Sequence, residues 1–378
     1  MMKTEVIKID PINPEAKIIE KAAEYIRQGK LVAIPTETVY GLAADISNPE
    51  AIKKLYEVKG RPQDKPFSIA IANDGALEYL AADVPALAYK LVDKFWPGPL
   101  TLVLKAAGPS QAISGEQDQI TSGESFGFAQ DKLRRTIGLR MPNNRVALRI
   151  IEASGVELAL PSANLSGIQP AQSAQEVLEY LDGKIDLVVD AGATELGIES
   201  TVADLTQPHL KILREGAVKK EELENIARSK RVLFVCTGNS CRSVMAEGLL
   251  KNALAKAKRR NVEVFSAGIA AYNCSGVTTE TAQLLAKEGI DMSEHRSQRV
   301  NKLMLKSADL ILVMDSLQQA RILELAPSVE KRLYLLKEFA KIIDNDLNIS
   351  DPIGQSMDYY QKVFYTIREA VERIANLL

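Results

Sequence analysis

The sequence predicts two α/β domains in one chain. It has 378 residues, a length that suits two compact cores better than one. Short apolar, β-branched runs alternate with longer helical patterns along the whole chain, which is typical of α/β architecture. A charged, helix-forming stretch at 218–230 precedes a new apolar strand. We therefore expect a helical linker at 218–230 between domains at 1–217 and 231–378.

The first domain has an α/β pattern with one irregular segment. Its predicted strands lie at 31–34, 100–105, 137–140, 157–160, 186–189, 201–204 and 211–213. Its predicted helices lie at 14–28, 49–58, 85–95, 145–153, 174–181 and 219–229, with Gly29 and Gly155 as helix stops. Between them, 109–135 is crowded with Ser, Gly, Gln and Asp, so we expect a disordered insertion; a functional lid is the alternative.

The sequence of the second domain predicts a smaller α/β fold. Strands are expected at 232–235, 262–266 and 310–313, and helices at 245–256 and 279–287. A further helix and strand follow, and the amphipathic segment 359–378 closes the chain. This order predicts a doubly wound, four-stranded parallel sheet.

Composition narrows the function classes. The 47 basic and 49 acidic residues nearly cancel, so no global field indicates a nucleic-acid or membrane-surface protein. Residues 1–14 carry charges every few positions, unlike a secretory signal or a transmembrane segment. Three cysteines and two histidines argue against a disulfide framework and a Cys/His zinc site. We therefore expect a cytoplasmic protein without a membrane contact.

A C-x(5)-R motif links the first strand and helix of the second domain. It comprises Cys236, Thr237, Gly238, Asn239, Ser240, Cys241 and Arg242, followed by Ser243. Backbone N–H groups at such a turn can converge on one anion at the positive end of a helix, and Gly238 would permit the tight turn. The Arg242 guanidinium can then fork onto two phosphoryl oxygens above the Cys236 sulfur. In that field a thiol pKa of about 8.5 can fall to roughly 4–7, which predicts a nucleophile that needs no histidine base.

A proton donor for this chemistry is found late in the chain. Asp351 precedes Pro352, which holds the aspartate in an extended conformation. We expect Asp351 to protonate the leaving group and then to activate the hydrolytic water.

The second domain resembles the low-molecular-weight protein phosphatase family from Arg231 to the C-terminus. The likeness rests on the cysteine loop, segments 266–268, 291–297 and 313–315, and the Asp-Pro pair. It implies that Cys236 is the nucleophile, Arg242 the phosphate clamp and Asp351 the acid and base, with no cofactor. Ser243 would stabilise the thiolate and Asn239 would hold the loop. Where the family usually has proline after that serine, this chain has Val244, from which we expect slight loosening of the loop.

The substrate of this domain is left open by the sequence. The loop and the D-P-x-G-x-S segment resemble a bacterial branch that includes protein-arginine phosphatases, so phosphoarginine and phosphotyrosine proteins are both candidates. Arsenate reduction, with Cys241 and Cys274 relaying a disulfide, is a third reading. A phospho-binding pseudo-enzyme is a fourth, but it would have lost Cys236 or Asp351.

In the first domain, polar side chains recur where apolar strands end. The segments are 35–42, 96–101, 136–140, 161–164, 199–201 and 213–216, together with the basic pair in 59–62. Ligands of α/β proteins bind at such strand ends. No G-x(4)-G-K-(S/T) motif occurs, which excludes an ordinary P-loop kinase or GTPase.

This set of motifs resembles the YrdC-like threonylcarbamoyl-AMP synthase family, from about Lys17 to Gly216. The resemblance implies a twisted mixed α/β sheet and a reaction of L-threonine, bicarbonate and ATP, with Mg²⁺, that yields threonylcarbamoyl-AMP and pyrophosphate. The product would feed the tRNA threonylcarbamoyl transferase machinery. The implied threonine-binding residues are Thr36, Arg140 and Ser200. The implied ATP-binding residues are Lys59, Arg61, Thr136, Ser162, Asn164 and Arg214.

Two expectations follow for the first domain. Since catalysis would come from positioning and positive charge, we expect Lys59→Ala to abolish activity with little effect on folding. The alternative is an RNA contact, in which a basic concave face binds double-stranded RNA without catalysis. Such a module would need basic residues but not the hydroxyls of Thr36, Ser162 and Ser200.

Overall fold

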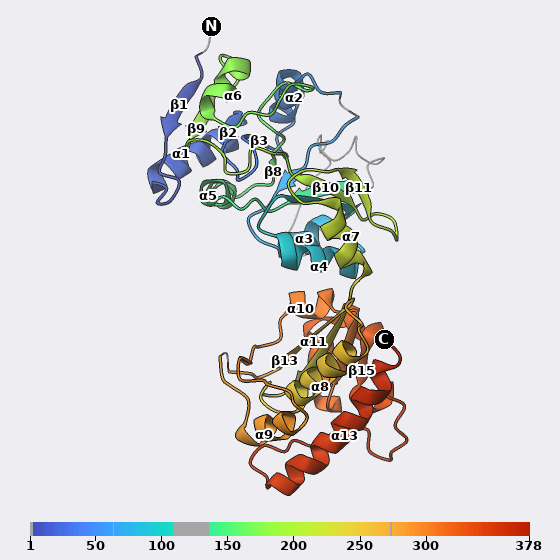
Figure 1. The fold of residues 1–378 in the computed structure, drawn as a ribbon. Coiled ribbons are helices and arrows are strands. Elements are labelled where there is room, and N and C mark those ends of the chain that lie inside the picture. The colour runs from blue at the N-terminus through green and yellow to red at the C-terminus, as the bar shows by residue number, and fades with distance from the viewer. Residues whose placement is uncertain (1–2, 63, 109–135, 273) are drawn as a thin grey trace, which may run out of the picture. The chain divides into compact units, whose positions relative to one another are not determined.

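The computed structural model describes residues 3–62, 64–108, 136–272 and 274–378. It divides into two compact units, Met1–Glu224 and Asn225–Leu378 (Figure 1). The division falls inside helix α7 (Lys220–Arg228), within the stretch 218–230 that we predict to be the linker. The predicted insertion 109–135 lies outside the described residues. None of the described helices has the length and apolar character needed to cross a membrane.

The first unit is built on a mixed sheet, as predicted. Its order is β1-β9-β2-β3-β8-β4-β7-β6-β10-β11, with β5 paired to β6. The strands are β1 (Glu5–Lys8), β2 (Val32–Ile34), β3 (Gly41–Asp45), β4 (Ile69–Ala70), β5 (Ala81–Ala82), β6 (Leu100–Ala106), β7 (Thr136–Arg140), β8 (Leu158–Ala159), β9 (Leu187–Asp190), β10 (Thr201–Asp204) and β11 (Lys211–Arg214).

Strands β1, β3, β4 and β5 are additional to the prediction. β4 and β5 span two residues each, which is too short to produce a readable alternation of apolar and polar residues. β3 begins at Gly41, inside the segment that the sequence indicates as a ligand-binding turn. Its register is set by antiparallel pairing with β2, which a single sequence does not reveal.

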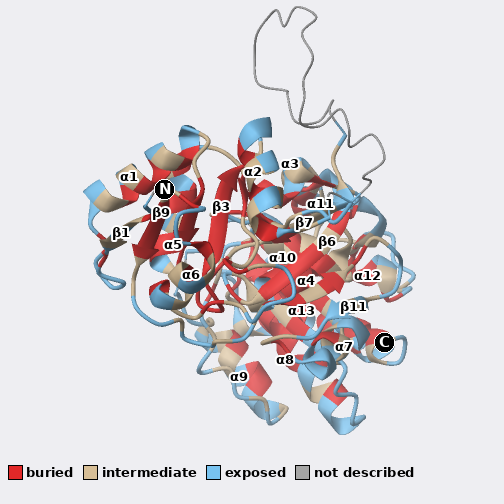
Figure 2. Cartoon of the chain, turned by 90° about the horizontal axis from the view of Figure 1, so that it is seen from above, coloured by how far each residue is buried: buried red, intermediate tan, exposed pale blue. Residues whose placement is uncertain are grey.

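Helices α1, α2, α5 and α6 pack on both faces of this sheet around β2. The helices of this unit before α7 are α1 (Ala16–Arg27), α2 (Pro49–Lys59), α3 (Ala76–Leu80), α4 (Ala86–Phe95), α5 (Arg145–Ser154) and α6 (Ala174–Leu181). Val32 and Ile34 of β2 join a core with α1 and α5, whereas Ala33 joins a second core with α2 and α6. The two cores lie on opposite faces of the sheet because successive side chains of a strand point to opposite sides. Figure 2 shows α1 buried on one side and exposed on the other, as its buried residues at spacings of three and four require.

The second unit contains the predicted four-stranded parallel sheet. Its order is β13-β12-β14-β15, and every pairing is parallel. The strands are β12 (Lys230–Cys236), β13 (Val262–Gly268), β14 (Leu310–Val313) and β15 (Leu333–Leu335). The helices are α8 (Arg242–Lys256), α9 (Thr279–Lys287), α10 (Lys302–Ser307), α11 (Ser316–Leu325), α12 (Leu336–Phe339) and α13 (Met357–Ala375), with a short 3₁₀ helix, η2, at Pro327–Arg332.

The central strand β12 determines where chemistry can occur in this unit. Val232 and Phe234 face a core shared with α8 and α13, while Leu233 and Val235 face a second core with α10 and η2. β12 is thus buried on both faces and reads as a continuous apolar run. Its carboxyl end delivers Cys236 directly to the loop before α8.

Candidate active sites

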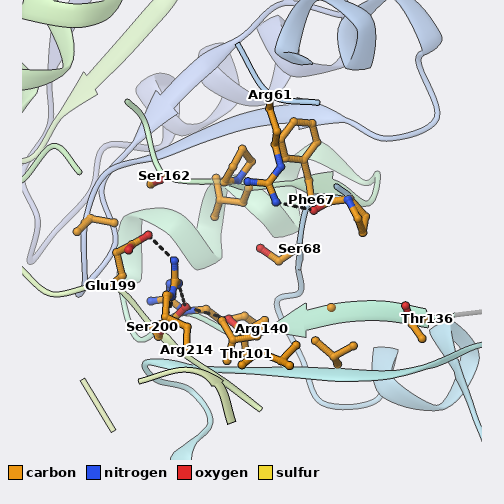
Figure 3. Close-up of a pocket in the computed structure, with 18 residues that line it drawn as sticks. Arg61, Phe67, Ser68, Thr101, Thr136, Arg140, Ser162, Glu199, Ser200 and Arg214 are labelled. Atoms are coloured by element: carbon orange, nitrogen blue, oxygen red, sulfur yellow. Dashed lines mark hydrogen bonds and ion pairs between the residues drawn. The ribbon is translucent and has the colours of Figure 1, made fainter. Parts of the chain in front are cut away.

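A cavity of about 300 Å³ opens over the half of the first sheet that contains β6, β7 and β10. Figure 3 shows basic and hydroxyl-bearing side chains converging on it. Its lining includes Arg61, Phe67, Ser68, Thr101, Thr136, Gly138, Arg140, Ser162, Glu199, Ser200 and Arg214. Six of the nine predicted site residues of this unit line the cavity: Arg61, Thr136, Arg140, Ser162, Ser200 and Arg214. The other three, Thr36, Lys59 and Asn164, are buried and are not among its lining residues.

Arg140, the last residue of β7, is held by a buried acid. Its Nη2 donates to Glu37 Oε1 (2.8 Å) and to Thr38 Oγ1 (2.8 Å), and its Nε donates to the carbonyl of Gly98 (3.3 Å). The Glu37 side chain is 3% exposed, and its Oε2 has no hydrogen-bond partner among the described residues. The Arg140 guanidinium is therefore fixed at the cavity while retaining donor capacity for a ligand.

Thr36 does not reach the cavity. Its Oγ1 donates to the carbonyl of Val39 (2.6 Å) and accepts from the backbone N–H groups of Thr38 and Val39 (3.2 and 3.3 Å). Its hydroxyl is therefore engaged in hydrogen bonds within the local turn. Thr38, which the sequence did not single out, is the threonine that contacts Arg140. Both lie in the same Pro-Thr-Glu-Thr segment, and only the folded turn distinguishes them.

Ser200 and Arg214 form one side of the cavity. Ser200 immediately precedes β10, and its Oγ lies 3.0 Å from Thr101 Oγ1. Arg214, at the end of β11, donates from Nη2 to Ser200 Oγ (3.2 Å) and from Nη1 to Glu199 Oε1 (2.5 Å). The pairing of β6 with β10 and β10 with β11 brings these residues together. The structure thus joins a predicted threonine-binding residue to a predicted ATP-binding residue.

Lys59 holds the loop that carries Ser162 and Asn164. It ends α2, a helix capped by the Asn48 side chain and terminated by Gly60 at φ 56°. Its buried Nζ donates to the carbonyls of Ser162 (2.5 Å) and Asn164 (2.5 Å) and to Asn164 Oδ1 (2.9 Å). Burial lowers the pKa of the Lys59 ammonium to about 8, with a further contribution from the charge of Arg61.

These contacts correct the expectation for Lys59→Ala. Because all three donors of the ammonium are used inside the fold, alanine would leave buried carbonyls without a partner. Each such loss costs about 1–3 kcal/mol. The substitution should therefore weaken folding as well as activity.

Arg61 and Thr136 lie at other parts of the rim. Arg61 sits 5.3 Å from the centre of the Phe67 ring and donates to the carbonyls of Lys65 (2.9 Å) and Pro66 (3.0 Å). Thr136 is exposed at the start of β7 and lies away from the group around Ser200 (Figure 3). The cavity therefore presents three guanidinium groups and several hydroxyls, which suits a polar, multiply anionic ligand.

In the second unit, Cys236 lies at the end of β12 beneath the start of α8. Its Sγ is 3.0 Å from Ser243 Oγ and accepts the backbone N–H of Asn239 (3.3 Å). Cys236 and Ser243 are both buried. These donors can stabilise negative charge on the sulfur.

Asn239 holds the loop in its conformation. It adopts φ 52°, in the left-handed region. Its Nδ2 donates to Ser243 Oγ (3.1 Å) and Ser266 Oγ (2.7 Å), and its Oδ1 accepts the N–H of Gln298 (2.9 Å). The positive φ of this turn is therefore at Asn239, whose side chain secures the strained backbone.

Arg242 and Asp351 come together although 109 positions separate them. Arg242 is 2% exposed, and its Nη2 pairs with Asp351 Oδ2 and donates to Thr237 Oγ1 (3.3 Å). Its Nη1 donates to Asp315 Oδ2 (3.1 Å) and to the carbonyl of Ile349 (2.9 Å). Its buried Nε has no partner among the described residues. Arg242 therefore keeps one N–H group, at Nε, that could donate to an anion bound in the loop.

The remaining loop residues have structural contacts. The carbonyl of Ser240 accepts the N–H of Thr278 (3.0 Å). Cys241 is buried, and its Sγ lies 3.8 Å from Asp351 Oδ1. Burial, and then the charges of Cys236 and Asp351, raise the pKa of the Cys241 thiol to about 12, so it stays protonated near neutral pH.

Two residues with roles in this site were not assigned from the sequence. Gln318 is fully buried, and its Nε2 donates to Asp315 Oδ2 (2.7 Å) and Thr237 Oγ1 (3.2 Å). Asp315 in turn binds Arg242. Asp315 stands in a segment that supported the family resemblance, but its target became visible only when β14 was placed beside β12.

Comparisons with known proteins agree with this division. The Sua5–YciO–YrdC family model, described as telomere recombination, matches residues 24–216, just over half of the chain. The low molecular weight phosphotyrosine protein phosphatase model matches residues 231–378.

Individual relatives match about three fifths of this chain. A threonylcarbamoyl-AMP synthase of Pyrococcus abyssi is 42% identical over 232 residues, which cover 61% of this chain and 63% of that protein. One of Bacillus subtilis is 40% identical over 217 residues, or 57% of this chain and 58% of that protein. The chain thus spans about three fifths of the length of these relatives.

A solved structure adds a likeness of fold. The crystal structure of P. abyssi Sua5 complexed with L-threonine has a TM-score of 0.51 and 29% identity, covering 88% of this chain and 98% of that one. The chain belongs to the Sua5–YciO–YrdC family through its first unit and carries a low-molecular-weight phosphotyrosine protein phosphatase domain as its second.

Proposed function

We propose that the first unit, residues 1–217, synthesises threonylcarbamoyl-AMP from L-threonine, bicarbonate and ATP. The observation that carries this proposal is the cavity lined by Arg61, Arg140 and Arg214 together with hydroxyl groups. The relatives named threonylcarbamoyl-AMP synthase support the choice of reaction. A reaction between bound anions needs positioning and positive charge rather than a nucleophilic side chain.

The reaction balances without a covalent enzyme intermediate. The threonine amine attacks the bicarbonate carbon, and water leaves to give a carbamate. A carbamate oxygen then attacks the α-phosphorus of ATP, the bond to the β-phosphate bridging oxygen breaks, and pyrophosphate departs. Guanidinium groups around the cavity stabilise the charge that develops on the phosphate oxygens.

The structure supports a division of the cavity between the two ligands. Arg140 and Ser200 bind threonine, with Thr38 in the place that the sequence assigned to Thr36. Arg61, Thr136, Ser162 and Arg214 bind ATP. Lys59 and Asn164 do not line the cavity but support that side through their contacts with Ser162.

Magnesium would arrive with the nucleotide. Within the described residues, no group of three or more His, Cys, Asp or Glu side chains could hold a metal ion. Triphosphate oxygens and water are the ligands that Mg²⁺ usually takes in such reactions. The product would pass to the tRNA threonylcarbamoyl transferase machinery, and an RNA contact would belong to that transfer.

The test is pyrophosphate release by the full chain with ATP, L-threonine and bicarbonate. We expect release to require all three, and mass spectrometry to detect threonylcarbamoyl-AMP. If pyrophosphate does not form while double-stranded RNA binds, the RNA-binding alternative replaces the synthase.

We propose that the second unit, residues 231–378, is a cysteine-dependent protein phosphatase. The Cys236 thiolate attacks phosphorus, the bond to the leaving group breaks, and Asp351 protonates that group. Water activated by Asp351 then hydrolyses the phosphocysteine, releasing phosphate and the thiolate. The unpartnered Nε of Arg242 and its junction with Asp351 carry this proposal.

The phosphorylated residue is tyrosine or arginine. The test compares phosphate release from phosphotyrosine and phosphoarginine peptides at equal concentration, with Cys236→Ser as the blank. Arsenate-dependent oxidation of a thiol reductant without phosphate release would indicate the arsenate reductase alternative. A reactive thiolate requires a reducing compartment, so we propose a cytoplasmic location.

A further inference from the structure

Ser68 places a hydroxyl inside the cavity of the first unit. It immediately precedes β4 in the middle of the sheet and lines the cavity. Its carbonyl accepts the backbone N–H of Leu160 (3.0 Å), and β4 pairs with both β7 and β8. The main chain beneath this side chain is therefore held from two sides.

The Ser68 hydroxyl has no hydrogen-bond partner among the described residues. Other hydroxyls of the cavity are engaged: Ser162 Oγ donates to Asn164 Oδ1 (2.6 Å), and the Ser200 and Thr101 hydroxyls lie 3.0 Å apart. Thr136 is exposed at the rim. Ser68 thus carries an uncommitted donor in the interior of the lining.

Ser68 lies beside Gly138 of β7, which also lines the cavity. A Cβ added at Gly138 would be 3.6 Å from Ser68 Cα and Cβ and 3.7 Å from Thr101 Cγ2, which is ordinary van der Waals contact. In Figure 3, Ser68 lies between Arg61 on one side and the group of Arg140, Thr101 and Ser200 on the other. It therefore lies between the parts of the cavity assigned above to ATP and to threonine.

We propose that Ser68 is a further substrate-contact residue, whose hydroxyl donates to the carbamate formed from threonine and bicarbonate. This inference rests on the proposed synthase function. The carbamate must lie between threonine and the α-phosphate, because it joins them. One of its oxygens attacks phosphorus, and the other needs a donor while charge redistributes. A neutral hydroxyl supplies that hydrogen bond without competing for the phosphates as another cation would.

The test compares wild type, Ser68→Ala and Ser68→Thr in threonine-dependent pyrophosphate release by the full chain. Loss of a hydrogen bond to a charged group predicts that Ser68→Ala lowers kcat/KM for bicarbonate about 10- to 100-fold. KM for ATP and the unfolding midpoint should not change. Ser68→Thr, which keeps the hydroxyl, should recover most of the rate. Ser166→Ala, exposed and outside the lining, serves as the matched control.

Each outcome decides the proposal. If Ser68→Ala matches wild type, or if it weakens ATP binding and rate by the same factor, the carbamate contact is wrong. If wild type itself releases no threonine-dependent pyrophosphate, the proposed synthase function fails, and the role of Ser68 in it fails too. The first two results leave an active wild-type enzyme, so the two failures are distinguishable.

Discussion

The two sites are built in opposite ways. The cavity of the first unit collects Arg61, Arg140 and Arg214 from distant parts of the chain and places them at the ends of different elements. The site of the second unit is largely one loop between β12 and α8, with Asp351 as its remote member. The dispersed site offers cations and hydroxyls around a space, whereas the compact site offers one buried sulfur with donors directed at it.

This difference indicates what each chemistry demands. Joining bound ligands requires several charges at set separations, which a sheet edge provides because neighbouring strands come from distant sequence. Nucleophilic attack requires one activated atom and a phosphate cradle, which consecutive backbone N–H groups provide at a helix start. Substitutions should therefore act on one activity at a time.

The largest effect among the substitutions should come from Asp351→Asn. Asparagine has nearly the same shape but cannot donate the proton that the leaving group needs. We expect phosphate release from phosphotyrosine peptide to fall about 10²–10⁴-fold. The first-turnover burst of phenol from an aryl phosphate with an acidic phenol should slow much less, because that leaving group needs no proton and departs before the phosphocysteine is hydrolysed. An equally slowed burst with this substrate and with phosphotyrosine peptide would contradict the general-acid role.

A smaller loss should follow Arg140→Lys in the first unit. Lysine keeps a charge for Glu37 but cannot fork onto a carboxylate while also binding Thr38. We expect kcat/KM for threonine to fall about 10- to 100-fold in the pyrophosphate assay. Arg145→Lys, an exposed exchange outside the cavity lining, is the matched control. An unchanged threonine dependence would remove Arg140 from the threonine site.

Asn239 allows backbone strain and side-chain bonding to be separated. Asn239→Gly accepts φ 52° freely but loses the bonds to Ser243 and Ser266, whereas Asn239→Ala loses the same bonds and adds strain. Both should lower phosphatase activity, and alanine should be less stable than glycine by about 1–2 kcal/mol. The measurement is the unfolding transition of the second unit in denaturant. Equal stability of the two variants would contradict the strain assigned to this position.

The smallest expected effect is a loss of synthase activity at alkaline pH. With its pKa lowered to about 8, Lys59 loses its charge as pH rises through that value, so synthase activity should fall on the alkaline side. The unfolded chain, with a lysine pKa near 10.4, holds this proton more tightly. Burying the charged Lys59 ammonium therefore lowers the free energy of unfolding below about pH 8. This cost disappears as the pH rises toward 10.4. The measurement is the rate of pyrophosphate release between pH 6.5 and 9.5 for wild type and for Lys59→Arg, which keeps its charge over this range. We expect the rate to fall at alkaline pH in wild type alone. A fall at the same pH in Lys59→Arg would assign it to another group.

Sequence reasoning could group the residues of the compact site because neighbours in the sequence are neighbours in the loop. Cys236 and Arg242 follow from strand, turn and helix alone, and the predicted parallel sheet places them at its carboxyl edge. The sequence did not reveal that Asn239 takes a positive φ, which its side chain secures through a hydrogen bond to Ser266 of β13. That contact depends on tertiary structure.

The dispersed site was predictable as a set of residues but not as an arrangement. The sequence assigned Arg140 and Ser200 to one site, yet it could not choose between Thr36 and Thr38, because the folded turn decides which hydroxyl contacts Arg140. The sequence also does not reveal that the Lys59 ammonium donates its three hydrogen bonds to the loop of Ser162 and Asn164. Strand pairing across distant sequence sets both outcomes.

The most direct test measures both activities in one preparation of the full-length Cys236→Ser variant. Serine removes the thiolate but leaves the first unit untouched. We predict that phosphate release disappears while threonine- and bicarbonate-dependent pyrophosphate release stays at the wild-type rate. Retained phosphate release, or loss of pyrophosphate release in this variant, would contradict the account of two separate sites with different chemistry.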